Sequence, residues 1–160
     1  YEKPWALTGT KCEREHNIVN SLYLKPEELE IKNFERYEKY KAIEENEVMY
    51  EEYLMDDAEV CVVAFGITSR VAKNAINEAR ANGVKVGMIR PITVWPFPKK
   101  VLAEAADKCK AFICVEMSMG QMVEDVRLAV EGKCPVEFYG RTGGMVPTPD
   151  AIYDNIRRCL

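Results

Sequence analysis

From about residue 58 onward, the chain alternates short apolar segments with stretches whose apolar residues recur every three or four positions. The apolar segments occupy residues 59–65, 84–90, 111–117 and 135–140, and they begin about 25 residues apart, the length of one strand and one crossover helix. They are apolar on both faces, which is typical of parallel strands covered by helices on either side.

The stretches between these segments carry the periodicity of amphipathic helices. Ala72, Ile76 and Ala79 share one face of the first, and Gly83 follows its end as a residue that tolerates a positive φ. Thr148 and Pro149 suit the N-cap and the first turn of the last helix. Alternating strands and helices predict an α/β fold, a three-layer α/β/α sandwich around an open, mostly parallel sheet.

The first 57 residues follow a different pattern. Pro26 and the two glutamates after it suit the first turn of a long helix. Apolar residues then recur with helical spacing along a helix that can break near Asn46, namely Tyr37, Tyr40, Ile43, Tyr50 and Leu54. We therefore divide the chain into residues 1–57, an acidic linker with an amphipathic helix, and residues 58–160, the α/β domain. The helix can lie on this domain or on a neighbouring one.

Charge and composition exclude several classes of protein. Residues 1–57 carry 8 Lys and Arg against 15 Asp and Glu, and residues 58–160 carry 14 against 11, so no basic field for nucleic acid exists. The longest apolar run, residues 60–65, is far shorter than the roughly 20 residues of a membrane span. The chain starts at Tyr1 with neither an initiator Met nor a signal peptide, and we interpret it as a piece of a longer protein.

Cysteine and histidine usage indicates no metal centre. The six cysteines are scattered and form no CxxC motif, a distribution that is typical of reduced, buried thiols in a cytoplasmic protein. The single histidine, His16, lies in the polar opening segment and lacks partners for a triad or a zinc site.

Four loops leave the carboxyl ends of the predicted strands, where open parallel sheets meet their ligands and partners. Their residues, 66–70, 90–98, 116–121 and 140–149, combine arginines with tryptophan and three methionines, an unusual mixture of anion-binding and apolar surface. We expect them to line one rim and to contact neighbouring domains or subunits through Thr68, Arg70, Arg90, Trp95, Phe97, Glu116 and Gln121.

Each loop leaves an alternative open. Gly66 to Ser69 can cradle a phosphate at a helix N-terminus or can simply begin the helix. Prolines hold Trp95 and Phe97 either toward a partner or back onto the core. Glu116 lacks a second acid for acid/base catalysis.

The Arg141 loop also has two interpretations. Arg141 beside Gly143 and Gly144 can bring backbone and guanidinium close to a bound phosphate or carboxylate, or the glycines can serve the turn alone.

The segments GITSRVAKNAINEAR, VGMIRPITVWPFP, VEMSMGQMVEDVRLAV and EFYGRTGGMVPTP occur in this order. Together they resemble the carboxyl-terminal part of the alpha-type subunit of 2-oxoacid:ferredoxin oxidoreductases, most closely those acting on 2-oxoisovalerate (3-methyl-2-oxobutanoate). The resemblance covers about residues 58–160, and it implies a transketolase C-terminal-like domain. Such domains often carry an antiparallel edge strand, which the sequence pattern does not locate.

The resemblance implies an enzyme that converts a 2-oxoacid, coenzyme A and oxidised ferredoxin to acyl-CoA, carbon dioxide and reduced ferredoxin. Thiamine diphosphate, Mg²⁺, [4Fe-4S] clusters and coenzyme A serve the complete enzyme, with a preceding pyrimidine-binding domain and a thiamine-diphosphate-binding subunit as partners. This piece holds neither a catalytic residue nor a cluster-binding cysteine run in that scheme. We therefore expect a structural and assembly domain that is inactive alone, with Arg141, Gly143 and Gly144 contacting coenzyme A or another subunit.

Two other hypotheses belong to different classes. The chain can be a flavodoxin-like module that binds the phosphate of FMN through residues 66–70, although those residues lack the Ser/Thr-rich cradle of such carriers. It can also be a pure interaction module that docks through the tyrosine-bearing helix.

Overall fold

The computed structural model describes all residues, 1–160, which fall into two compact units, residues 1–40 and residues 41–160. Residues 1–25 contain turns and extended backbone but no strand or helix. The first helix, α1 (Pro26–Asn46), begins at the predicted proline, with Glu27 and Glu28 in its first turn. No residue of α1 is buried.

The apolar stripe of this helix stops at Asn46, near the break that the sequence left open, and does not continue to Tyr50 and Leu54. The helix ends at Asn46, and the side-chain amide of Asn46 donates to the carbonyl of Ala42 at 2.7 Å. Tyr50 then starts a strand, β1 (Tyr50–Tyr53), and Leu54 follows it with a positive φ of 54°. The spacing of Tyr50 and Leu54 from the helical tyrosines matched a helix by coincidence.

The sheet has five strands in the order β1-β3-β2-β4-β5. The strands β2 (Val60–Val63), β3 (Val86–Pro91), β4 (Ala111–Glu116) and β5 (Val136–Gly140) run parallel and lie within the four predicted segments to about one residue. Every residue of β2 and β4 is buried, as expected for strands that are apolar on both faces. The mostly parallel three-layer fold is thus confirmed.

The antiparallel edge strand is β1, which pairs with β3 in a register that joins Tyr50 to Pro91 and Tyr53 to Met88. Polar contacts attach it to its neighbours. Glu51 accepts from Lys73 Nζ at 2.6 Å and from Arg90 Nη1 at 2.9 Å. The sheet therefore uses residues 50–53, which precede the predicted boundary at residue 58. The division of the whole protein into domains stays a prediction.

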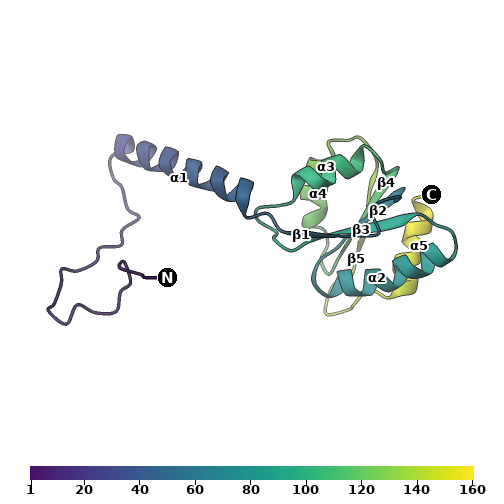
Figure 1. The fold of residues 1–160 in the computed structure, drawn as a ribbon, viewed down its shortest axis with the longest axis horizontal. Coiled ribbons are helices and arrows are strands. Elements are labelled where there is room, and N and C mark those ends of the chain that lie inside the picture. The colour runs from purple at the N-terminus through teal and green to yellow at the C-terminus, as the bar shows by residue number, and fades with distance from the viewer. The chain divides into compact units, whose positions relative to one another are not determined.

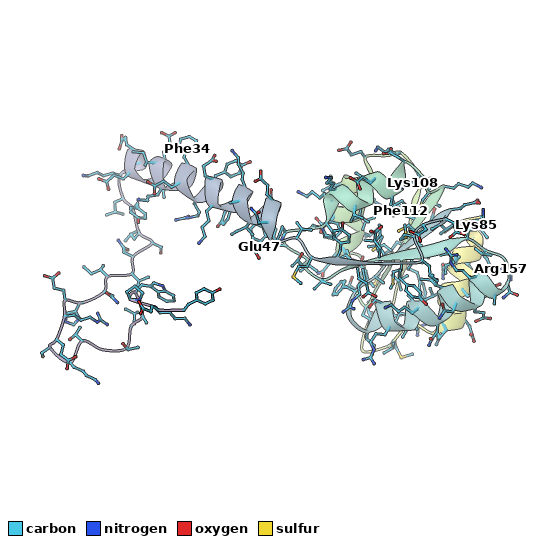
Figure 2. The ribbon with its side chains drawn as sticks, in the orientation of Figure 1. Phe34, Glu47, Lys85, Lys108, Phe112 and Arg157 are labelled. Atoms are coloured by element: carbon cyan, nitrogen blue, oxygen red, sulfur yellow. The ribbon has the colours of Figure 1, made fainter.

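Helices cover both faces of the sheet (Figure 1). The helices α2 (Gly66–Ala81) and α5 (Pro149–Arg158) pack on one face, and α3 (Lys99–Ala106) and α4 (Met122–Val130) pack on the other. Phe112, labelled in Figure 2, is fully buried on the α3 and α4 side. Three cysteines, Cys61, Cys109 and Cys114, fill this core as predicted, whereas Cys12 is exposed.

None of the five helices combines the length and the apolar character that crossing a bilayer requires.

Candidate functional site: the carboxyl rim of the sheet

The four loops that follow β2, β3, β4 and β5 leave the same edge of the sheet, because these strands are parallel. We call residues 65–70, 91–98, 117–121 and 141–148 the carboxyl rim. The chain leaves β2 through α2 toward β3, and it leaves the adjacent β4 through α4 toward β5. This reversal of direction is the place where open α/β sheets meet ligands and partners.

The carboxyl rim contains no aspartate and no glutamate, and its only cations are Arg70 and Arg141. Arg70 is exposed and Arg141 is half-buried. All ion pairs of the domain involve other residues, so neither guanidinium has a carboxylate partner in the chain.

The rest of the rim surface is strongly apolar. Fourteen large hydrophobic residues of residues 41–160 are exposed, and nine of them belong to the carboxyl rim. The nine are Phe65, Ile67, Ile92, Val94, Trp95, Met117, Met119, Met145 and Val146. Met119 has the greatest exposed fraction among them, 83%. A monomeric surface rarely gathers apolar side chains in this way unless they meet a partner.

Glu116, at the end of β4, is the structural centre of the rim rather than part of its surface. Only 4% of the residue is exposed. Its carboxylate accepts backbone N–H groups at the start of α4, and it also accepts the Ser118 hydroxyl. The donors are Gln121 N at 3.1 Å, Met122 N at 3.0 Å, Val123 N at 3.0 Å and Ser118 Oγ at 3.0 Å. These groups would otherwise lack partners at a helix N-terminus.

The contacts of Glu116 also fix its ionisation. Burial raises the pKa of the carboxyl, but the hydrogen bonds from the start of α4 and from Ser118 outweigh that effect, so the pKa lies below its ordinary value. A buried carboxylate that stays charged and saturated with donors offers nothing to a partner. The prediction that Glu116 contacts a neighbouring domain or subunit stays a prediction, while its carboxylate already bonds within the chain.

The β4–α4 loop and the β5–α5 loop are in direct contact. A Cβ atom on Gly140 would lie 2.4 Å from the carbonyl oxygen of Ser118, a distance that only glycine permits. The next residue, Arg141, donates its backbone N–H to the carbonyl of Glu116 at 3.0 Å. The end of β5 thus places Arg141 beside the methionine-bearing loop.

Beyond Arg141 the chain forms an open turn. Gly143 and Gly144 have φ values of 63° and 83°, and Met145 N donates to Thr142 O at 3.1 Å. Both glycines are exposed, and no atom lies within 4 Å of a Cβ built on either of them. The positive φ angles, rather than crowding, explain the glycines here.

The first turn of α2 uses its hydroxyls internally. Thr68 Oγ1 donates to the carbonyl of Phe65 at 2.5 Å, and Ser69 Oγ donates to that of Gly66 at 2.8 Å. Thr68 and Ser69 are 3% and 1% exposed, so both lie below the surface of the chain, and the contact of Thr68 with a partner stays a prediction. Of the predicted residues in this loop, Arg70 alone lies at the surface.

The β3–α3 loop separates its two aromatic residues. Trp95 is 53% exposed, whereas Phe97 is 7% exposed and packs in the core beneath α3. The interface role of both residues stays a prediction. Thr93 stabilises this loop, because its hydroxyl accepts from Met49 N at 3.0 Å and donates to Pro96 O at 2.8 Å. Arg90, predicted at the interface, is half-buried and instead holds β1 through Glu51.

The residues predicted for the interface therefore differ in exposure, and their contacts with other domains stay a prediction. Arg70, Trp95, Gln121, Gly143 and Gly144 are exposed, and Arg141 is half-buried. The sequence prediction did not include the exposed aliphatic residues that follow β2 and β3, such as Ile67 and Ile92. The available signal was the run of apolar residues that continues beyond the end of each buried strand.

Known proteins match this chain closely. Residues 58–152 match the family described as "Pyruvate:ferredoxin oxidoreductase core domain II". The ketoisovalerate oxidoreductase subunit VorB of Methanothermobacter marburgensis is 52% identical over 140 residues, which cover 88% of this chain and 39% of that protein. The 2-oxoglutarate synthase subunit KorA of the same organism is 38% identical over 101 residues, 63% of this chain and 27% of that protein.

Two solved structures share the fold. The 2-oxoglutarate:ferredoxin oxidoreductase from Magnetococcus marinus, with 2-oxoglutarate, coenzyme A and succinyl-CoA bound, has a TM-score of 0.74 at 24% identity and covers 86% of this chain and 24% of that chain. A split-gene transketolase, described as an inactive tetramer of four beta subunits, has a TM-score of 0.60 at 18% identity. The match covers 70% of this chain and 41% of that chain. The expected transketolase-like fold is confirmed.

The chain spans about two fifths of the length of the VorB relatives, which are 52% and 50% identical to it. No comparison supports the flavodoxin-like alternative or a pure interaction module. The match covers β2 to the start of α5, the part of the chain that forms the parallel sheet and its carboxyl rim. The chain is therefore homologous to VorB, and it belongs to the pyruvate:ferredoxin oxidoreductase core domain II family.

Proposed function

We propose that this chain is part of a 2-oxoacid:ferredoxin oxidoreductase that acts on 3-methyl-2-oxobutanoate. The reaction combines the 2-oxoacid, coenzyme A and oxidised ferredoxin to give acyl-CoA, carbon dioxide and reduced ferredoxin. The observation that carries the proposal is the 52% identity with a ketoisovalerate oxidoreductase subunit, against 38% with a 2-oxoglutarate synthase subunit. We place the complex in the cytoplasm, in keeping with scattered free cysteines.

The residues present do not fit a thiamine diphosphate and Mg²⁺ site. Mg²⁺ takes oxygen ligands, usually carboxylates, yet the carboxyl rim has no acid of its own and Glu116 is saturated with donors. The N-terminus of α4, which would suit a diphosphate, is already filled by that carboxylate. We therefore propose that a preceding pyrimidine-binding domain and a partner subunit hold this cofactor, and that the [4Fe-4S] clusters also lie outside this chain.

Coenzyme A fits the chain better, since its phosphates require cations and accessible backbone. Arg141 has no carboxylate partner, and the turn at Gly143 and Gly144 is open. In the complete enzyme these residues would contact coenzyme A or a neighbouring subunit, while Arg70, Trp95 and Gln121 would contact other domains. Coenzyme A supplies the thiol that receives the acyl group.

The activity is tested with the complete subunit produced together with its partner subunits. We expect acyl-CoA formation and ferredoxin reduction with 3-methyl-2-oxobutanoate, at a higher kcat/KM than with 2-oxoglutarate or pyruvate. A preference for either of the other acids would overturn the substrate assignment. A complex that forms no acyl-CoA from any 2-oxoacid would overturn the activity.

The location of the thiamine site is tested with residues 1–160 alone. Isothermal titration with thiamine diphosphate and Mg²⁺ should give no binding, because the chain lacks the ligands. Micromolar affinity would contradict the assignment of that site to other parts of the enzyme. The complete complex, titrated in parallel, is the positive control.

A further inference from the structure

The two edges of the sheet differ sharply in chemistry. Residues 54–59, 82–85, 107–110 and 131–135 form the opposite, amino edge, and nine of these nineteen residues are charged. Several of the charges pair with one another: Glu59 lies 3.5 Å from Lys85 and also pairs with Lys110. Lys85 is labelled in Figure 2. The amino edge has the composition of a surface that faces water.

The carboxyl rim has the contrary composition. It exposes nine large apolar residues, against one, Leu54, on the amino edge, and it contains two arginines and no acid. Methionine adapts its shape to a facing surface, and tryptophan and arginine are the residues that most often anchor protein contacts. The cationic and apolar composition is therefore complementary to a protein surface that is apolar and carries carboxylates.

The rim loops are also held rigidly before any partner arrives. Glu116 fixes the β4–α4 loop through three backbone N–H groups, and Gly140 brings β5 against that loop. Thr93 fixes the β3–α3 loop to Met49. Loops that need no ordering lose less conformational entropy on association, so a surface built in this way favours a stable contact.

We propose that the carboxyl rim is buried against another protein surface of the same enzyme, one that is apolar and presents carboxylates to Arg70 and Arg141. The proposal rests on the proposed function for the existence of that enzyme, and it chooses a protein contact over coenzyme A for Arg141. A phosphate is bound by cations and N–H donors, so phosphate binding does not account for nine exposed apolar side chains on four loops. Two cations are fewer than the basic cluster that binds an anionic lipid surface.

Methionine oxidation in the assembled enzyme tests the burial directly. A brief hydrogen peroxide pulse converts accessible methionine to its sulfoxide, and mass spectrometry reads each site. Leu128→Met, on the outer face of α4, provides a matched reporter, since Leu128 is 73% exposed and Met119 is 83% exposed in the chain. Each rate is divided by the rate of the same peptide in urea.

We expect Met119 and Met145 to be oxidised at least about tenfold more slowly than the reporter at position 128, because a protein interface excludes the oxidant. Similar rates at all three positions would overturn the proposal. The measurement needs no turnover, so it is independent of the 2-oxoacid. An enzyme with protected methionines and no 2-oxoacid activity would refute the proposed function alone.

Charge reversal tests the partner's chemistry. Arg70→Glu with Arg141→Glu should weaken the assembly, with at least a tenfold gain in Met119 oxidation, because carboxylates would face carboxylates. Lys85→Glu, on the amino edge, is the control and should leave the oxidation rate unchanged. If Arg141→Glu raised the KM for coenzyme A while Met119 stayed protected, the ligand would be a phosphate. If the complex floated with anionic vesicles, it would be a membrane. Either outcome overturns the proposal.

Discussion

Replacement of Glu116 by glutamine tests whether this carboxylate holds the start of α4. The substitution keeps the size of the side chain, but one carboxylate oxygen becomes an NH₂ group that donates rather than accepts. If the remaining oxygen keeps the contacts of Met122 and Ser118, the N–H of Val123, 3.0 Å from the other oxygen, loses its acceptor. Two donors then face each other in a site that is 4% exposed.

The expected loss follows from these contacts. A buried donor without an acceptor costs about 1–3 kcal/mol. The lost attraction between the charge and the positive end of the helix dipole adds about 0.3–2 kcal/mol. We therefore expect Glu116→Gln to lower the free energy of unfolding by about 1–5 kcal/mol at pH 7.

Urea unfolding of residues 1–160, followed by far-UV circular dichroism, measures this loss. Glu124→Gln is the matched control, because Glu124 lies exposed in the first turn of the same helix and makes no side-chain hydrogen bond there. It should cost no more than about 0.5 kcal/mol. Equal losses for the two variants would refute the assignment of Glu116 as an internal partner of the helix.

The pH dependence provides a second check with a defined sign. The folded-state pKa of Glu116 is lowered, because the hydrogen bonds outweigh the opposing effect of burial. The carboxylate therefore contributes its full stabilisation above the unfolded pKa of about 4.3, and it loses this contribution as the pH falls through the lower folded pKa. The difference between wild type and Glu116→Gln should be constant from pH 8 to about 5 and shrink only below about pH 4.

Three further variants or reactions probe the sheet and its core. Glu51→Gln removes an acceptor shared by two half-buried cations, Lys73 and Arg90, so it should cost at most about 1 kcal/mol and speed hydrogen exchange in β1. Exchange unchanged from wild type would show that strand pairing alone holds the edge. Gly87→Ala places a Cβ 2.5 Å from the carbonyl oxygen of Leu54 and should cost about 1–3 kcal/mol in urea unfolding, whereas wild-type stability would contradict that close approach. Burial raises the pKa of the Cys61 thiol well above its ordinary value. At pH 8, iodoacetamide should therefore label the exposed Cys12 in the native chain and label Cys61 only in urea. Equal labelling of the two cysteines in the native chain would contradict the buried position of Cys61.

The sequence alone determined the parallel part of the fold. Val60–Val63 and Ala111–Glu116 are apolar on both faces, a pattern that suits strands between two helical layers. Short-range signals also located the last helix, where Thr148 Oγ1 accepts from Ala151 N at 3.3 Å and Pro149 occupies the first turn. Since parallel strands end at one edge, their order along the chain was enough to place the four loops on a common rim.

Only the tertiary structure decided which residues of that rim are surface. The strand Tyr50–Tyr53 has the sequence YEEY and no apolar pattern, so its assignment depends on hydrogen bonds to β3, about 40 residues away. Trp95 and Phe97 are equivalent by composition, yet packing beneath α3 buries Phe97 alone. From the sequence alone Glu116 is a lone acid at the end of a strand, and only the fold shows that its carboxylate accepts the N–H groups at the start of α4. Such contacts join distant segments, and a linear pattern of polar and apolar residues does not encode them.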